Sequence, residues 1–215
     1  SGQIAKTTNG GTSWSVASAG WGSAAGYEIF IVNPSVIYAC GAGGRVSKST
    51  DGGASFFQLP SLGTATLYSM HFFDANTGFI AASGGNLFKT TNGTNFNPVT
   101  NPATSIIYSL SFYSPSIGWM GTSTGDVFYT EDAGDNWTRA HANLGNTQAV
   151  RDIQFGGGYL WFVGSDGMIV RGFGDPQIPV ELTSFTASVS DGLVHLNWQT
   201  ATETNNAGFE IQRKS

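Results

Sequence analysis

The residues of this chain that could carry chemistry are few and widely spaced. Glu28 and Asp152 stand at equivalent places near the start of two expected strands, and glycoside hydrolysis needs two such carboxylates facing each other across a cleft. Solvated charges are the interpretation we favour for both. His71, His141 and His195 lack the spacing of metal ligands, so we interpret them as surface residues. We predict no catalytic residue, no metal and no cofactor.

Composition excludes several classes of function. The net charge is −5 and the nine Lys and Arg residues are scattered singly, so the sequence shows no basic patch for nucleic acid or an anionic membrane surface. No apolar stretch is long enough to span a bilayer, which predicts no membrane insertion. A charged fraction of 11% and 30 glycines among 215 residues are typical of sheets and turns.

A repeated motif organises most of the chain. "KTTNGGTSW" is followed by "KSTDGGASF", "KTTNGTNF" and "YTEDAGDNW", which place box motifs at 7–14, 49–56, 90–96 and 130–137. Glycines recur with them at steps of 42, 41, 40 and 42, and they define a degenerate fifth unit over 150–174: Gly2, Gly44, Gly85, Gly125 and Gly167. A period near 40 with short β-branched and aromatic runs predicts an all-β propeller of four-stranded antiparallel blades, with about five repeats that are partial at both ends.

The motif itself is predicted to be a structural turn. Asn or Asp before Gly accepts backbone hydrogen bonds and tolerates the conformations of a tight hairpin. The four turn positions are Asn9, Asp51, Asn92 and Asp132. The aromatic residues expected to pack under them are Trp14, Phe56, Phe96 and Trp137. Because two turn positions are amides, we do not expect them to act as general acids.

These motifs resemble the Asp-box, also called the BNR repeat, of sialidases and related propellers. The longer unit "LYSMHFFDANTGFIAASGGNLFKTTNGTNF" is closer to the propeller family typified by the photosystem II stability and assembly factor. The resemblance covers residues 1–175 and implies that the box is structural. Sialidase chemistry would need an arginine triad, and no sialidase arginine motif surrounds any of the five arginines: Arg45, Arg139, Arg151, Arg171 and Arg213.

A second module begins after the repeats. Residues 176–180 form a predicted linker, and residues 181–215 carry alternating strands expected at 182–189, 193–198 and 209–213. The segment "PVELTSFTA...LNWQTATETNNAGFEIQR" resembles the fibronectin type III-like module of proteins secreted by the type IX system of Bacteroidota. That resemblance implies an extracellular or outer cell-surface location. Such a sandwich needs about seven strands, so the module is expected to be incomplete.

One set of residues is a candidate binding rim. Aligning the units places Tyr27, Tyr68, Tyr108 and Arg151 at one equivalent position, with Glu28 and Asp152 beside them. Large amphipathic side chains are good binding material, although packing between blades is the interpretation we favour.

The function we predict is a non-enzymatic, secreted or cell-surface binding or structural scaffold. Its partner would be a protein or carbohydrate ligand. Two alternatives remain open. One is a fragment of a polysaccharide-degrading propeller whose catalytic residues lie outside this stretch. The other is a subunit of an extracellular fibre or surface assembly, a homo-oligomer completed by strand addition at open sheet edges.

Overall fold

The computed structural model describes residues 2–141, 148–156, 159–173, 182–190 and 193–200. Contacts divide the chain into two units, Ser1–Gly174 and Asp175–Ser215. The described residues form strands and turns, with three-residue 3-10 turns at Ala42–Gly44, Ser83–Gly85 and Ser165–Gly167, so the all-β prediction is confirmed. No described helix is long and apolar enough to cross a membrane. The predicted linker lies outside the described residues.

Three antiparallel four-stranded sheets form the middle of the first unit, each built from strands that are consecutive in the chain. The first contains β3 (Gly26–Ile31), β4 (Ile37–Gly41), β5 (Val46–Ser49) and β6 (Phe57–Gln58). The second contains β7 (Leu67–Phe72), β8 (Gly78–Ala82), β9 (Leu87–Thr90) and β10 (Asn97–Pro98). The third contains β11 (Ile107–Phe112), β12 (Gly118–Thr122), β13 (Val127–Thr130) and β14 (Thr138–His141).

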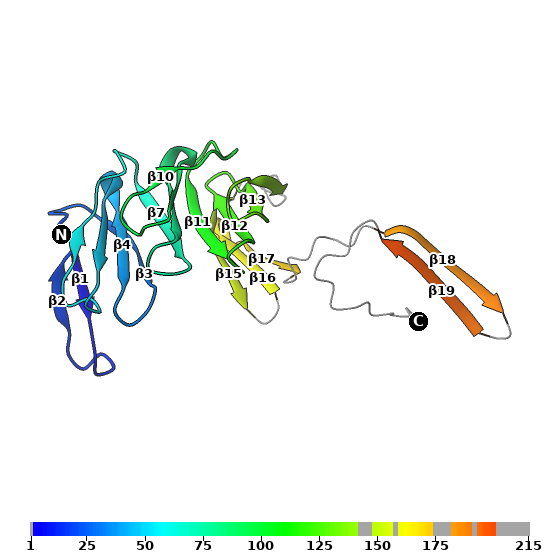
Figure 1. Ribbon diagram of the computed structural model, residues 1–215, viewed down its shortest axis with the longest axis horizontal. Coiled ribbons are helices and arrows are strands. Elements are labelled where there is room, and N and C mark those ends of the chain that lie inside the picture. The colour runs from blue at the N-terminus through cyan, green and yellow to red at the C-terminus, as the bar shows by residue number, and fades with distance from the viewer. Residues whose placement is uncertain (1, 142–147, 157–158, 174–181, 191–192, 201–215) are drawn as a thin grey trace. The chain divides into compact units, whose positions relative to one another are not determined.

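Smaller sheets flank these three. β1 (Gln3–Lys6) pairs with β2 (Ser15–Ser18), and these strands correspond to the third and fourth strands of a repeat. β15 (Val150–Gly156), β16 (Tyr159–Gly164) and β17 (Ile169–Phe173) correspond to the first three. Figure 1 shows the sheets of the first unit following one another in chain order.

The second unit is described only as a strand pair. β18 (Leu182–Ser190) pairs antiparallel with β19 (Leu193–Thr200), with Phe185 opposite Trp198. These strands lie where the sequence predicts the first two strands of the module, and the third, over 209–213, lies outside the described residues. Two strands do not define a sandwich, so the fibronectin-like assignment stays a prediction.

The recurring glycine has a clear conformational cause. All five glycines of the series have φ between 52° and 81°, the left-handed region that other residues rarely adopt. Space is also short, because a Cβ on Gly85 would stand 2.0 Å from the carbonyl oxygen of Ala103. The position therefore fixes the turn between the second and third strands of each repeat.

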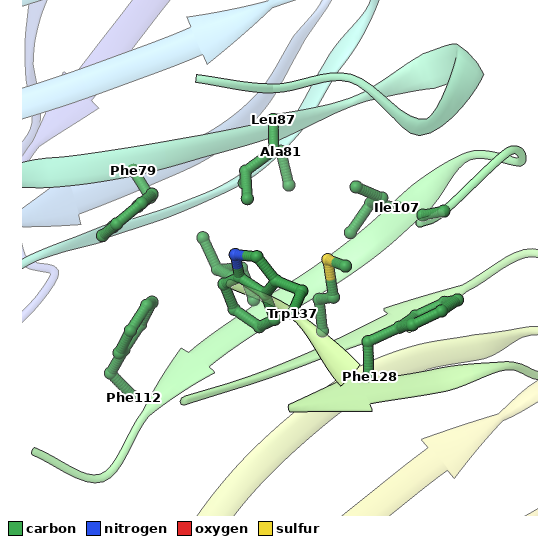
Figure 2. Packing of buried hydrophobic residues seen from close by; sticks show 10 residues of the cluster. Phe79, Ala81, Leu87, Ile107, Phe112, Phe128 and Trp137 are labelled. Carbon is green, nitrogen blue, oxygen red and sulfur yellow. The ribbon is translucent and has the colours of Figure 1, made fainter. Parts of the chain in front are cut away.

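The core lies between neighbouring sheets. Where the sheet β7–β10 meets the sheet β11–β14, the rings of Phe79 and Phe112 stack with centroids 5.1 Å apart, and Trp137 meets Phe112 edge-on at 5.9 Å. Figure 2 shows this cluster, with the indole of Trp137 among residues of both sheets. Where these two sheets adjoin, each thus buries one face against the other.

Candidate functional site

Each box motif closes its hairpin through one repeated pair of side chains. In the second box the Gly53 amide donates to the hydroxyl of Ser49 (2.8 Å), and the Ser55 amide donates to Asp51 Oδ1 (2.9 Å). The Ser55 hydroxyl and amide, which donate to the carboxylate, hold the pKa of Asp51 well below its usual value. This carboxylate is therefore committed to the turn.

The amide-bearing and acidic boxes share this geometry. The Ser13 amide donates to Asn9 Oδ1 at 2.9 Å, and the Asn136 amide donates to Asp132 Oδ1 at 2.9 Å. In the third box, which is one residue shorter, the donor to Asn92 Oδ1 is the Asn95 amide at 2.8 Å, three residues on instead of four. A carboxylate and an amide oxygen thus serve equally well as the acceptor of the turn.

The aromatic residues of the boxes differ in burial. Trp137 is 7% exposed and Phe56 and Phe96 are half-buried, but Trp14 is 60% exposed. The prediction that Trp14 is packed like the others is wrong. Its Nε1 still donates to the Gly11 carbonyl (3.2 Å), as Trp137 Nε1 does to Gly134, but no described strand lies before β1 to cover it.

A lysine series that the sequence interpretation missed ties the sheets together. Lys6 Nζ donates to the Gly52 carbonyl (2.5 Å), Lys48 to the Gly93 carbonyl (3.3 Å), and Lys89 to the Ala133 carbonyl (3.0 Å). Each lysine therefore reaches the box turn of the next repeat. The sequence motif could have revealed this series, because a lysine precedes three of the four boxes. In the fourth, Tyr129 takes its place, and the repeat that follows has no box for a lysine to reach.

The candidate rim residues occupy a repeated β-bulge. The register between the first and second strands of each sheet shifts at one position, and the residue there is Tyr27, Tyr68, Tyr108 or Arg151. A bulge leaves its extra residue unpaired and re-aims the side chain. The aligned position of these four residues therefore has a backbone cause.

These four side chains form a continuous row. The ring centroids of Tyr27 and Tyr68 are 5.0 Å apart, those of Tyr68 and Tyr108 are 5.1 Å apart, and the guanidinium of Arg151 lies 4.1 Å from the Tyr108 ring. Tyr27 is 51% exposed, Tyr68 and Tyr108 are half-buried, and Arg151 is exposed. The row, which we call the tyrosine row, thus joins neighbouring sheets and also meets solvent.

The residue after each bulge points to the next sheet. Glu28 accepts a hydrogen bond from the Met70 amide, and Ser69 Oγ accepts one from the Leu110 amide (3.2 Å). Asp152 Oδ1 instead accepts from its neighbour Ile153 (2.8 Å) and from the Ser109 hydroxyl (3.4 Å). Side chain to backbone bonds therefore link β3 to β7 and β7 to β11, and a side chain to side chain bond links β11 to β15.

A cavity of about 300 Å³, which we call the central cavity, lies among the first strands of four sheets, β3, β7, β11 and β15. Glu28 and Asp152 both line it, together with polar residues such as Ser111 and Gln154. Asp152 is exposed, but Glu28 is half-buried, so the prediction of a solvated charge at Glu28 is wrong. Burial raises the pKa of Glu28 to about 7, against the lowering effect of its bonds to Met70 and Ser69.

His71 also lines the central cavity. Its ring lies 5.2–5.4 Å from those of Phe30, Phe73 and Phe112, and the residue is half-buried. Burial lowers its pKa to about 4, so the ring is neutral at pH 7. The prediction of a surface residue is wrong for His71, because sheets about 40 residues apart in sequence supply its neighbours. The side chains of His141 and His195 lie outside what the structure describes.

The described residues form no arginine cluster, no metal site and no reactive cysteine site. Arg139 pairs with Asp126, Arg151 covers Tyr108 and Arg171 covers Tyr159, so these arginines face different partners. No group of three or more His, Cys, Asp or Glu in the described part could hold a metal ion. Cys40 is fully buried in β4, and burial raises the pKa of its thiol. Arg213 lies outside the described residues.

Comparison with known proteins identifies the fold. No protein-family model and no curated protein matches the chain. Among solved structures, YCF48 bound to a D1 peptide matches with a TM-score of 0.51 and 16% identity, covering 71% of this chain and 66% of that chain. The WD40 β-propeller domain of Doa1 matches at 0.57 and 9% identity, covering 69% and 51%. An ancestral GH74 enzyme matches at 0.54 and 18%, covering 82% and 25%.

This chain has a β-propeller fold. The propeller prediction is therefore confirmed, and its neighbours include YCF48, as the resemblance of the repeats implied. The match spans about two thirds of the YCF48 chain, and identities this low carry the fold alone. Within the described propeller, the tyrosine row and the cavity among β3, β7, β11 and β15 each bring exposed or titratable side chains together.

Proposed function

We propose that this propeller is a non-enzymatic, extracellular binding scaffold that holds a protein segment along the tyrosine row. The row itself carries the proposal: three bulged tyrosines and one arginine form a partly exposed line of amphipathic contacts. Tyrosine offers large contact area at low entropic cost, and arginine and tyrosine are enriched at binding hot spots. A propeller of the same fold, YCF48, is known with a bound peptide.

The peptide proposal is tested by selection. A phage-displayed random peptide library is panned against the immobilised propeller, and the affinities of the selected peptides are measured by calorimetry. We expect Tyr108→Ala and Arg151→Ala to weaken binding about ten-fold or more, the loss typical of hot-spot residues. Phe57→Ala is the matched control, because Phe57 is 50% exposed on β6 and lies outside the row.

Two results would contradict it. Selected peptides that keep their affinity in both row variants would place binding elsewhere. Failure of the peptide selection, together with binding on a glycan array that Tyr108→Ala abolishes, would make the ligand a carbohydrate.

A second candidate is an assembly subunit completed by strand addition. Its support is the uncovered face beside β1, where Trp14, Ile29 and Ile31 are 60%, 50% and 67% exposed. Exposed apolar surface next to an unpaired strand edge favours association. Sedimentation tests this: Ile31→Lys should convert an oligomer into a monomer, and a wild-type monomer at high micromolar concentration would exclude it.

Glycoside hydrolysis is supported by one observation, that Glu28 and Asp152 share a cavity and that the pKa of Glu28 is raised to about 7, as a general acid requires. An assay on glucans and sialosides with wild type and Glu28→Gln tests it. Hydrolysis that the variant loses would establish an enzyme. No turnover of any of these substrates by the wild-type chain would argue against one.

A further inference from the structure

The described lining of the central cavity carries acidic side chains without a positively charged one. Two carboxylates, Glu28 and Asp152, line it, and its described lining includes no lysine or arginine. Arg151, the nearest cation in sequence, is directed to the Tyr108 ring and to Ser165 Oγ (3.5 Å). His71 is neutral because burial lowers its pKa to about 4. A carboxylate that is partly withdrawn from water, as Glu28 is, either pairs with a cation or takes up a proton, and no described side chain of the lining supplies a cation.

The oxygen atoms of Asp152 leave room for such a partner. Oδ1 accepts both described bonds, from Ile153 and Ser109, while Oδ2 accepts none from the described residues. Glu28 lies on the opposite side of the group of strands, on β3, and its carboxylate is fixed by the Met70 amide. The two acids interact electrostatically, which contributes to the raised pKa of Glu28.

The other lining residues are aromatic, aliphatic and polar. The ring centroids of Phe30 and Phe112 lie 5.4 and 5.2 Å from that of His71. The lining also includes Met70, Leu110, Ile153 and Phe155, and the polar residues Ser69, Ser111 and Gln154. Aromatic faces attract organic cations, and aliphatic walls accommodate an alkyl chain. A volume of about 300 Å³ suits a small head group with a short stem.

We infer that the central cavity binds one organic cation, an alkylammonium or guanidinium group, with Glu28 and Asp152 as its counter-charges and the Phe30, His71 and Phe112 rings around its stem. The cation is either a free small molecule or the lysine or arginine side chain of a bound peptide. A divalent metal does not fit, because no three His, Cys, Asp or Glu side chains among the described residues lie close enough together to hold one, although His71 also lines the cavity. This site is separate from the tyrosine row and does not require that the row bind a peptide.

The site predicts a pH dependence with a definite sign. Glu28 must be ionised to act as a counter-charge, and its pKa in the empty cavity is about 7. Lowering the pH from 8 to 6 reduces its ionised fraction, and hence the affinity for the cation, about ten-fold. The other groups facing it are Asp152 and the thiol of Cys40, whose pKa is raised by burial, so that thiol stays neutral.

The test is a titration followed by nuclear magnetic resonance of the backbone amides, with n-butylammonium as the probe and n-butanol as its neutral analogue. We expect saturable shifts of the Met70, Leu110 and Ile153 amides with n-butylammonium at pH 8, and about ten-fold weaker binding at pH 6. Asp152→Asn and Glu28→Gln should each weaken binding at least five-fold at pH 8. Asp166→Asn is the matched control, because it removes the same charge at a turn outside the cavity, where asparagine tolerates the φ of 53°.

Each outcome of this titration either supports or overturns the cation site. Equal shifts with n-butanol would mean an apolar cavity without selectivity for cations and would overturn the inference, as would equal weakening by Asp166→Asn or no saturable shift below 50 mM probe. Binding that is lost in both cavity variants supports it. A blocked peptide with a central lysine then separates the two sources: tighter binding than n-butylammonium supports a partner's side chain, and equal or weaker binding supports a free cation.

Discussion

Two equivalent interfaces of this propeller differ in what covers them. Between the sheets β7–β10 and β11–β14, Trp137 is 7% exposed and Phe112 is 7% exposed. At the other end of the repeat series, the position of Trp137 is held by Trp14 in the repeat of β1 and β2, and that of Phe112 by Ile31 in the repeat of β3–β6; these two residues are 60% and 67% exposed. The two turns share their hydrogen bonds, so the turn is a local structure, while burial of its aromatic residue depends on the preceding sheet.

The same contrast runs along the first strands. Ile29 on β3 is 50% exposed, whereas its equivalents Met70 and Ile153 are each 1% exposed. A repeat of this kind cannot bury both faces alone, so each sheet is stabilised by its neighbour. Local pattern therefore gives no measure of how much a residue contributes to stability.

The largest expected difference separates the two tryptophans. Trp137→Ala should lower the free energy of unfolding by about 3–5 kcal/mol, because it leaves a cavity among Phe79, Phe112 and Phe128. For a unit of this size that corresponds to a fall in Tm of about 6–20 °C. Trp14→Ala should cost less than about 1 kcal/mol, since its ring is already solvated. Calorimetry measures the stability of both variants. Equal losses of stability would show that the Trp14 ring is covered in solution.

The second contrast uses the first strands. Met70→Ala should cost about 2–5 kcal/mol, and Ile29→Ala less than about 1 kcal/mol, because only Met70 is removed from water. Urea denaturation followed by tryptophan fluorescence gives both values under one condition. A large loss for Ile29→Ala would mean that another strand or a second copy covers β3 at the protein concentration used.

Much of the fold could be predicted from sequence because its signals are local. Strand runs, the left-handed glycines and the box side chains act within a few residues, so the repeat and its strands followed from the pattern. The aligned position of Tyr27, Tyr68, Tyr108 and Arg151 was also visible, although the bulge that turns these side chains out was not. His71, Glu28 and Trp14 were misjudged because their burial depends on sheets about 40 residues away. The lysines recur in the motif, but the carbonyl groups to which they donate lie in the next repeat, so the motif alone did not reveal these hydrogen bonds.

The third prediction concerns Glu28 and His71, two titratable side chains that line the central cavity. Glu28 has its pKa raised to about 7, so the unfolded state loses that proton first and stability falls as pH rises from about 4.5 to 7. His71 has its pKa lowered to about 4, so the unfolded state binds that proton first and stability falls as pH drops from about 6.5 to 4. Over the shared window, about 4.5 to 6.5, the two slopes oppose each other.

Single variants should separate these slopes. Glu28→Gln keeps an acceptor for the Met70 amide and should gain about 1–3 kcal/mol over wild type at pH 7.5, with its stability now falling toward acid. His71→Phe keeps the ring contacts and should show the opposite slope, falling from pH 4.5 to 7. Urea titrations at pH 4.5, 5.5, 6.5 and 7.5 measure both. Parallel profiles for wild type and the two variants would contradict the burial of these groups.

The smallest expected contrast tests how the end sheet is held. Lys48 is 8% exposed, donates to the Ala75 and Gly93 carbonyls at 3.0 and 3.3 Å, and lies 4.9 Å from the Tyr38 ring. Lys48→Met keeps the stem but leaves those carbonyls with fewer donors, which should cost about 1.5–3 kcal/mol. Lys6→Met removes one tie to Gly52 in a half-buried place and should cost about 1 kcal/mol or less of global stability.

Hydrogen exchange separates global from local effects of these lysines. Because Lys6 joins the sheet β1–β2 to the box of residues 49–56, its loss should raise exchange at the amides of β1 and β2 while those of β7–β9 stay protected. Lys48→Met should raise exchange on both sides of its interface. If Lys6→Met instead speeds exchange uniformly, the end sheet belongs to the same cooperative unit as the interior, and the difference between the two interfaces is one of burial but not of folding.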